Sequence, residues 1–256
     1  MKKIILALSL LFPAALLADT VSEVGAYSNF IWRGTTFTEN KPAIQGEIDH
    51  ETEQGFFLGG FFSNAEFSDE AMSKHATVSQ EMDAMIGKRW YGKNWEAQLM
   101  YGKFFFPNAG VFDTDEFNFT FKYESLFLEL SYMDDYFGYQ GVYQYVRVGY
   151  EWIYKESIEG AIFVGYNAFK KPKGNLKSRC LDDACSEEAF TTTGAGNPDY
   201  IDIYFVNRKT FDNKMAAEIA FNWTNRHEYL ADGGIITKQK AKDFALIVAY
   251  IIPFPL

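Results

Sequence analysis

Polar and apolar side chains alternate one by one through much of this chain, and this pattern limits the fold more than any other feature. Residues 116–124 read EFNFTFKYE, so aromatic side chains hold the odd positions and polar side chains the even ones. Side chains two residues apart lie on the same face of a strand, whereas a helix would scatter these aromatics around its axis. The segment therefore predicts a strand with one aromatic and one polar face.

The same alternation recurs along the chain and predicts a nearly all-β protein. Further clear examples are residues 42–51, 78–90, 95–102, 142–152 and 215–224. Weaker patterns occur at 21–36, 56–66, 126–132, 158–168, 200–209 and 241–254. Together these segments predict about twelve strands, an even number.

The connections between these strands alternate in length. Short ones are expected near residues 52–55, 92–94, 124–125, 154–157 and 211–214. Longer ones are expected near residues 38–41, 67–77, 107–115, 133–141, 170–199 and 225–240, the first being short for its class. Tight turns at one end and long loops at the other are typical of the up-and-down meander of an outer-membrane barrel.

Periodicity alone leaves open whether the apolar face lines a dry core or faces lipid. Charges at mid-strand positions favour a polar interior. Aromatic residues gather near strand ends, where they would form girdles at the two membrane interfaces. On the turn side these are Trp90, Tyr91, Trp95, Tyr123, Trp152 and Tyr154, and on the loop side Trp32, Phe104, Phe105, Phe106, Tyr132, Phe169, Trp223 and Tyr229. We therefore expect a closed antiparallel transmembrane β-barrel, with a soluble secreted β-sandwich as the alternative.

The two ends of the sequence agree with export and assembly in a membrane. Residues 1–18 carry Lys2 and Lys3 before an apolar stretch and end at Ala18, which predicts a secretory signal peptide. Residues 19–256 then form a single barrel domain. The last residues alternate up to Leu256, as expected of a final strand recognised by the barrel-assembly machinery, although Pro253 and Pro255 remove two ladder donors.

Charge and rare residues exclude several other functions. The net charge of −10 makes the chain a poor ligand for nucleic acid, and two cysteines cannot hold an iron–sulfur cluster. His50, His75 and His227 are scattered, so we expect no metal, cofactor or catalytic site. Asp113, Asp115 and Glu116 could form a loose calcium site, but a solvated acidic loop is the favoured interpretation.

The longest connection, residues 170–199, begins basic and becomes acidic. Cys180 and Cys185 lie within it, and we expect them to form a disulfide in an oxidising exterior. The loop itself could be a lid or an inward-folded constriction. The alternative is a surface loop whose charges contact lipopolysaccharide.

The polar parity of the strands supplies the candidate functional residues. Eleven carboxylates and four cations are expected to line the lumen, and a negatively biased lumen would favour cations. The alternative is that interdigitated ion pairs fill and close a narrow barrel. The candidates are Glu23, Arg33, Glu47, Asp49, Glu81, Asp83, Arg89, Glu96, Lys122, Glu129, Arg147, Glu151, Glu159, Asp202 and Glu218.

Residues 28–64 resemble a known family. The stretches SNFIWRG at 28–34, NKPAIQG at 40–46 and GFFLG at 55–59 are similar to those of the TorF-type porin family, also catalogued as Gcw-type conserved hypothetical proteins. The resemblance implies a Gram-negative outer-membrane barrel that acts as a porin. Arg33, Lys41, Pro42 and Gln45 match the family stretch, and pore lining and loop closure are both open roles for them.

The function expected from the sequence is passive diffusion of small hydrophilic solutes or ions through the outer membrane. The partners would be outer-membrane lipid, lipopolysaccharide, the barrel-assembly machinery, and small solutes or cations. A non-conducting structural or adhesive barrel is one alternative. An outer-membrane enzyme is a weaker one, because neither His75 nor His227 has an obvious nucleophile partner.

Overall fold

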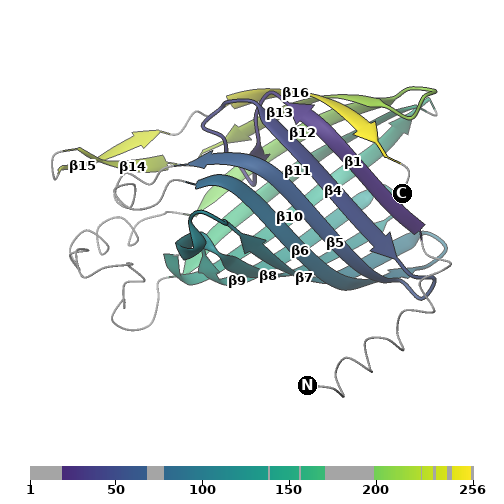
Figure 1. The fold of residues 1–256 in the computed structure, drawn as a ribbon, viewed down its shortest axis with the longest axis horizontal. Coiled ribbons are helices and arrows are strands. Elements are labelled where there is room, and N and C mark those ends of the chain that lie inside the picture. The colour runs from purple at the N-terminus through teal and green to yellow at the C-terminus, as the bar shows by residue number, and fades with distance from the viewer. Residues whose placement is uncertain are drawn as a thin grey trace, which may run out of the picture.

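Twelve strands pair in sequence order and the first pairs with the last, so the sheet closes into an antiparallel barrel (Figure 1). The computed structural model describes residues 19–67, 78–137, 139–155, 157–170, 199–225, 227–232, 235–240 and 244–254. The expected signal peptide at 1–18, the Cys180–Cys185 pair and nearly all of the 170–199 loop lie outside the described residues. No helix among the described residues is long and apolar enough to span a membrane.

The barrel strands confirm the fold class and most of the expected boundaries. They are β1 (Asp19–Tyr27), β4 (Ala43–Glu51), β5 (Phe56–Phe67), β6 (Val78–Tyr91), β7 (Trp95–Phe105), β8 (Thr114–Tyr123), β9 (Leu126–Tyr136), β10 (Tyr139–Tyr154), β11 (Ile158–Lys170), β12 (Tyr200–Thr210), β13 (Ala216–Thr224) and β16 (Phe244–Pro253). A short 3-10 helix, Gly110–Phe112, precedes β8.

Closure depends on β1, which pairs with β4 on one side and with β16 on the other. Pro253 lies at the end of β16 opposite Glu23, where the ladder loses little from a missing donor. The next residue still bonds to β1, because Phe254 N donates to Ser22 O at 2.8 Å. The closed ladder leaves no sheet edge, which is the condition for a spanning sheet.

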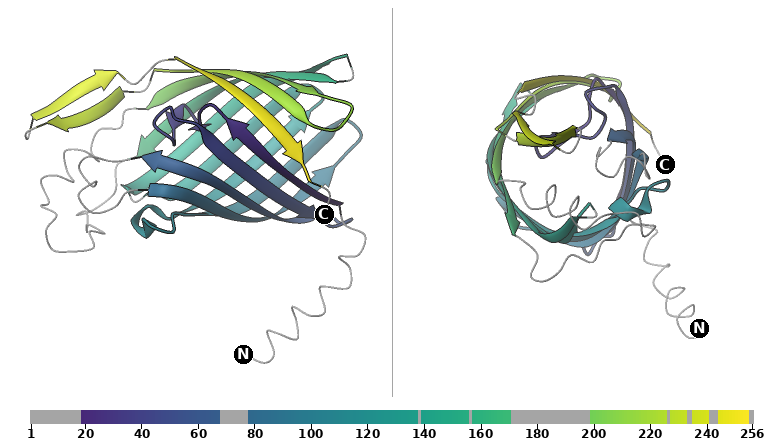
Figure 2. Two further views of the ribbon diagram at one scale, coloured as in Figure 1. Left: turned by 45° about the horizontal axis from the view of Figure 1, so that its top comes forward. Right: turned by 90° about the vertical axis from the view of Figure 1, so that its left-hand side faces the viewer.

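Two short hairpins lie outside the barrel ladder. β2 (Ile31–Trp32) pairs with β3 (Thr35–Thr36) in the connection between β1 and β4. β14 (His227–Asp232) pairs with β15 (Ile235–Lys240), so the expected loop at 225–240 contains a hairpin. It projects beyond the loop end of the barrel, and β13 pairs directly with β16 (Figure 2).

Two expectations about connections are wrong. The strand expected at 21–36 ends at Tyr27, and the connection to β4 runs from residue 28 to 42. The long loop expected at 133–141 is only residues 137–138, because β9 and β10 continue as a tall hairpin. Its inner residues Met133, Tyr136 and Tyr143 are buried in an aromatic cluster, and this packing extends the ladder.

The barrel is apolar outside and polar inside. Large apolar side chains are exposed on the outer face of successive strands, for example Ile44, Leu58, Ile86, Leu99, Phe117, Leu130, Val148, Val164, Ile201, Ile219 and Val248. Side chains of the opposite parity are polar and buried, for example Ser63, Glu81, Glu116, Asn118, Glu129, Ser131, Asn167, Asp202 and Asn222. This arrangement inverts that of a soluble sandwich and suits a lipid surrounding.

Candidate functional site

The connection between β1 and β4, residues 28–42, turns into the barrel, and we call it the inner loop. Viewed down the barrel, it lies inside the ring of strands (Figure 2). Trp32 pairs with Thr35, so Arg33 and Gly34 form the two-residue turn of the β2–β3 hairpin. Both have positive φ, 48° and 77°, as a type I′ turn requires. The hairpin therefore presents the Arg33 side chain at its tip.

Short polar side chains hold the base of the inner loop. Asn29 Oδ1 accepts hydrogen bonds from Thr36 Oγ1 at 2.8 Å and from Thr38 Oγ1 at 3.1 Å. Thr38 Oγ1 also accepts from Phe30 N at 3.1 Å. These bonds give the backbone an alternative to the sheet ladder, and β1 stops at Tyr27, directly before the segment that they hold.

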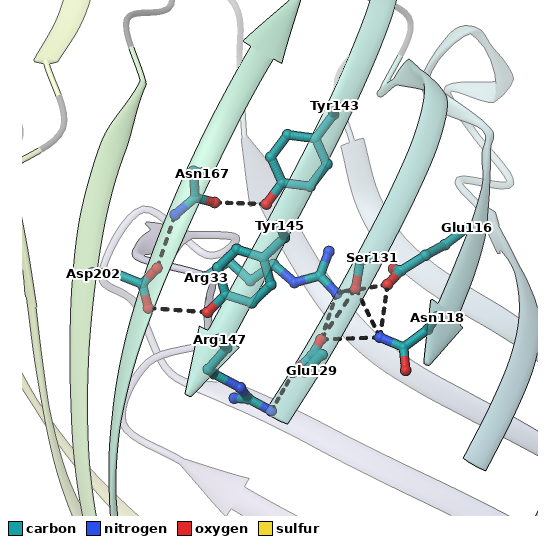
Figure 3. A network of polar contacts seen from close by, with 10 residues as sticks. All are labelled: Arg33, Glu116, Asn118, Glu129, Ser131, Tyr143, Tyr145, Arg147, Asn167 and Asp202. Atoms are coloured by element: carbon teal, nitrogen blue, oxygen red, sulfur yellow. Dashed lines mark hydrogen bonds and ion pairs between the residues drawn. The ribbon is translucent and has the colours of Figure 1, made fainter. Parts of the chain in front are cut away.

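Arg33 crosses the interior and binds the wall opposite β1 (Figure 3). Its Nη2 lies 2.6 Å from Glu116 Oε1 on β8, 2.8 Å from Glu129 Oε1 and 2.6 Å from Ser131 Oγ on β9. The side chains of Arg33, Glu116 and Glu129 are only 6%, 2% and 7% exposed. β9 is six strands from β1 in either direction around the barrel, so the inner loop with Arg33 reaches from β1 across the interior to this wall.

Charge neutralisation accounts for the burial of this arginine. Burial alone would lower the pKa of Arg33, but Glu116, Tyr143 and Glu129 outweigh that effect and hold the pKa well above its ordinary value. Glu129 also receives Arg147, whose Nη2 lies 2.6 Å from Glu129 Oε2. A buried ion pair contributes little net stability, but removing one partner is costly, so the network fixes the position of the inner loop.

Aromatic packing seals the inner loop against the same wall. The ring of Trp32 contacts those of Phe104, Tyr136, Phe137 and Tyr143 at centroid distances of 5.4–6.2 Å. The buried cluster also includes Phe37, Phe106, Phe112 and Tyr145, with Phe169 packed against it. Four residues expected in the loop-side girdle, Trp32, Phe104, Phe106 and Phe169, therefore pack inward. Trp32 and Phe104 contact each other, while Phe106 contacts Phe137 and Phe169 contacts Tyr136.

A third set of contacts ties the hairpin tip to β12 and β13. Tyr200 OH donates to Arg33 O at 2.9 Å. A Cβ on Gly34 would lie 2.9 Å from Asp202 Cβ and 3.1 Å from Thr224 Oγ1. The tip is therefore too close to the wall for any side chain at residue 34, besides needing positive φ there.

A second polar chain runs along the wall beside the inner loop (Figure 3). Tyr143 OH donates to Asn167 Oδ1 at 2.6 Å, and Asn167 Nδ2 donates to Asp202 Oδ2 at 2.8 Å. Tyr145 OH donates to the other oxygen of Asp202 at 3.3 Å. The buried carboxylate of Asp202 thus has a donor on each oxygen.

Another charged cluster lies at the turn end of the inner face. Arg89 binds both oxygens of Asp49 at 2.8 Å and Glu51 Oε2 at 2.7 Å, while its Nε donates to Gln98 Oε1 at 2.8 Å. Its guanidinium also lies 4.1 Å from the centre of the Phe57 ring. This cluster contains no residue of the inner loop.

All fifteen candidate residues lie on the inner side, fourteen on the inner parity of their strands and Arg33 on the inner loop. Arg208 binds Glu23 at 3.0 Å and pairs in register with Glu159 and Glu218. Lys122 lies 3.1 Å from Glu151. Glu47, in the middle of β4, and Glu159, near a turn, are exposed, and Glu96 is partly exposed. The charged inner residues around Arg33 are thus packed at the loop end, whereas those farther toward the turns are more exposed and lie beside buried apolar residues such as Phe57 and Ile251.

Glu81 and Asp83 differ from the other candidates. Both lie on the inner face of β6, and Glu81 is 2% exposed. Glu81 Oε2 and Asp83 Oδ1 are buried with no hydrogen-bond partner among the described residues.

Two other residues that match the family stretch lie away from the Arg33 network. Lys41 pairs with the exposed Glu66, and Pro42 O accepts from Asn64 Nδ2 at 3.1 Å.

The three carboxylates considered for calcium point in different directions. Asp113 Oδ1 accepts from Phe106 N, Asp115 lies beside Lys103 on the outer face, and Glu116 binds Arg33 inside. Within the described residues, no cluster of three histidine, cysteine or acidic side chains could hold a metal ion. His50 bonds Thr20 at 2.8 Å, and the side chains of His75 and His227 lie outside the described set.

Sequence reasoning missed several residues of the site. Glu116 was assigned to the acidic loop end, although its parity already placed it with the inner residues of β8. Arg208 shares the inner parity of Asp202 and could have been found in the same way. Asn118, Ser131, Tyr143, Tyr145 and Asn167 carry no charge, so only the fold identifies their role.

Two solved structures similar to this chain are named as a porin and as an outer membrane channel. A structure named KdgM porin aligns over 93% of this chain and 99% of its own, with 7% identity and a TM-score of 0.51. The COG4313 outer membrane channel from Pseudomonas putida F1 aligns over 93% and 96%, with 11% identity and a TM-score of 0.51. At these identities the likeness shows a shared barrel fold.

Sequence comparison gives the family. A search of curated proteins found no match. The family model described as bacterial protein of unknown function (Gcw_chp) matches residues 17–179, well over half of the chain, and this range includes the inner loop and its docking wall. The chain therefore belongs to the Gcw_chp family.

Proposed function

We propose that this protein is an outer-membrane channel for passive diffusion of small hydrophilic solutes and ions, with cations favoured. The observation that carries the proposal is the closed barrel with exposed apolar side chains outside and charged side chains inside. Such a surface requires lipid around it, and the similar channel structures support the same environment. Outer-membrane lipid, lipopolysaccharide and the barrel-assembly machinery would then be its partners, after export by residues 1–18.

Cation preference follows from the balance of inner charges. Adding Glu51, Glu116 and Arg208 to the candidate residues still leaves carboxylates in clear excess over cations. Glu47, Glu96 and Glu159 have no ion-pair partner within 4 Å among the described residues, and Glu96 and Glu159 lie near the turn end. Rings of carboxylates at a channel mouth attract cations and repel anions.

The inner loop is the proposed constriction. It crosses the interior at the loop end, where the side chains packed against it are buried, whereas the charged inner residues Glu96 and Glu159 near the turns are partly or fully exposed. Passage of solute therefore requires this loop to leave the β8–β9 wall. The same packing favours one second candidate, a non-conducting barrel in which the loop never leaves.

Planar-bilayer recordings test the proposal. In a KCl gradient we expect the reversal potential to show K⁺ passing more readily than Cl⁻. Glu96→Gln should reduce that preference, whereas Glu53→Gln, in the exposed turn 52–55, should leave it unchanged. A preference for Cl⁻ would contradict the assignment of inner carboxylates to the conduction path. Absence of current in both the wild type and a variant lacking the Arg33 side chain would favour the non-conducting barrel.

A further inference from the structure

The wall that receives Arg33 presents three acceptors to a single nitrogen. Glu116 Oε1, Glu129 Oε1 and Ser131 Oγ lie 2.6–2.8 Å from Arg33 Nη2. Asn118 holds these acceptors together, since its Nδ2 lies 2.8 Å from Ser131 Oγ and 3.0 Å from Glu129 Oε1. All four side chains belong to β8 and β9, so the site is built into the barrel wall and not into the inner loop.

A guanidinium fits this site incompletely. Each Nη of arginine carries two hydrogens, yet three acceptors converge on Nη2. Arg33 Nη1 is buried and has no hydrogen-bond partner among the described residues. A primary ammonium group carries three N–H donors on one nitrogen, which matches three convergent acceptors and leaves no second nitrogen to bury.

Aromatic faces complete a site for an organic cation. The guanidinium carbon of Arg33 lies 4.4 Å from the ring centre of Tyr145 and 5.9 Å from that of Tyr143, both on β10. The same carbon lies 4.2 Å from the ring centre of Trp32, which belongs to the inner loop. A cation over an aromatic ring at these distances is attracted by the ring quadrupole. The wall keeps both tyrosines when the loop leaves.

Charge also favours a cation once Arg33 has gone. Arg147 then remains beside Glu129 Oε2, but Glu116 has no other cation within 4 Å among the described residues. Two nearly buried carboxylates facing one remaining arginine give the site a net negative charge. Burying a lone carboxylate is unfavourable, so the undocked state is stabilised by any small cation that reaches it.

We propose that the Glu116–Glu129–Ser131 wall is a binding site for solutes with a primary ammonium group, and that Arg33 is a tethered substitute which such a solute displaces. Displacement releases the inner loop, so binding and opening are coupled. This inference rests on the proposed channel function. It adds a solute class and a means of opening that the fold alone does not imply.

Competition with Arg33 sets the expected size of the effect. A site occupied by its own loop most of the time has its apparent affinity reduced by the fraction that is free. Arg33→Ala should therefore strengthen binding of methylammonium by about tenfold or more. Ser131→Ala should weaken methylammonium more than guanidinium, because it removes one of the three acceptors and a guanidinium nitrogen needs only two.

The experiment uses the full-length protein in bilayers with methylammonium as the probe and tetramethylammonium, which has no N–H donor, as the matched control. We expect methylammonium to raise the fraction of time that the wild-type channel is open and tetramethylammonium not to. Trp32 fluorescence, taken as the difference from Trp32→Phe, should change with methylammonium in parallel. Glu116→Gln, which keeps Arg33, should reduce both responses even if Arg33→Ala fails to fold.

The two proposals fail in different ways. A cation-selective current that responds equally to methylammonium and tetramethylammonium overturns the ammonium site and leaves the channel intact. Methylammonium responses that survive both Glu116→Gln and Ser131→Ala also overturn it. If no variant carries current but Trp32 fluorescence still changes with methylammonium, the ammonium site is supported and the channel function is refuted.

Discussion

Replacing Arg33 with methionine should release the inner loop while leaving the barrel intact. Methionine keeps an unbranched apolar chain of similar reach but removes the three hydrogen bonds from Nη2 to Glu116, Glu129 and Ser131. Undocking lets water reach the two carboxylates that lose their partner. The barrel ladder contains no residue of the inner loop, so the cost falls on docking and not on strand pairing.

The magnitude follows from what each carboxylate retains. Removing one partner of a buried ion pair costs about 3–5 kcal/mol in general. Glu129 keeps Arg147 at 2.6 Å, whereas among the described residues Glu116 keeps only the Asn118 amide at 3.2 Å. We therefore expect the lower end, about 3 kcal/mol, which shifts the ratio of docked to undocked loop by roughly a hundredfold.

Single-channel recording measures this shift as the fraction of time at full conductance. Acrylamide quenching of Trp32, taken as the difference from Trp32→Phe, gives a second measure, because Trp32 is packed against four rings only while the loop is docked. The fraction of time at full conductance and the quenching of Trp32 should both rise in Arg33→Met.

Arg89→Met is the matched control. Arg89 is also an inner arginine bonded to two carboxylates, Asp49 and Glu51, but it lies at the turn end and contacts no residue of the inner loop. The fraction of time that the Arg89→Met channel is open should equal that of the wild type. An Arg33→Met barrel that folds, runs with the mobility of the folded form on a gel without heating, and shows no change in current or quenching would refute the reasoning.

Three further predictions test other parts of the structure. Gly34→Ala should open the channel as Arg33→Met does, because residue 34 has φ of 77° and its Cβ would lie 2.9 Å from Asp202 Cβ; unchanged currents would place the tip away from β12. Val148→Lys, on the outer face, should lower the free energy of unfolding in lipid vesicles by about 2–4 kcal/mol. Thr120→Lys, on the inner face, should lower it much less, and equal losses would contradict the orientation of the strands. Raising KCl from about 0.1 M to about 1 M should reduce the K⁺ preference seen in reversal potentials, since the exposed inner carboxylates are then screened, and a preference independent of salt would point to buried sites instead.

The strands could be predicted because their cause is local. In β8 each aromatic residue from Phe117 to Tyr123 faces outward and each polar residue between them faces inward, as the alternation predicts. The same reasoning places the inner carboxylates of β4, β6 and β12 on the correct parity. Parity needs only the two-residue repeat of a strand, which is present in the sequence itself.

The inner loop could not be predicted in the same way. The weak pattern over 21–36 predicts a strand, and Trp32 resembles a girdle residue near its end. The contacts that turn the hairpin inward come from residues far along the chain, with Arg33 bonding partners 83, 96 and 98 positions away and Tyr200 bonding it from 167 positions away. No local pattern reports such partners.

The sequence by itself therefore determined the number of strands and which side chains share a face, since both follow from neighbouring side chains. Only the tertiary structure decided which connection enters the barrel, where the ion pairs form and which aromatics leave the girdle. The physical reason is that a buried charge such as Arg33 is tolerated only where acceptors from other strands converge on it, and closure of the barrel is what brings β8 and β9 opposite β1.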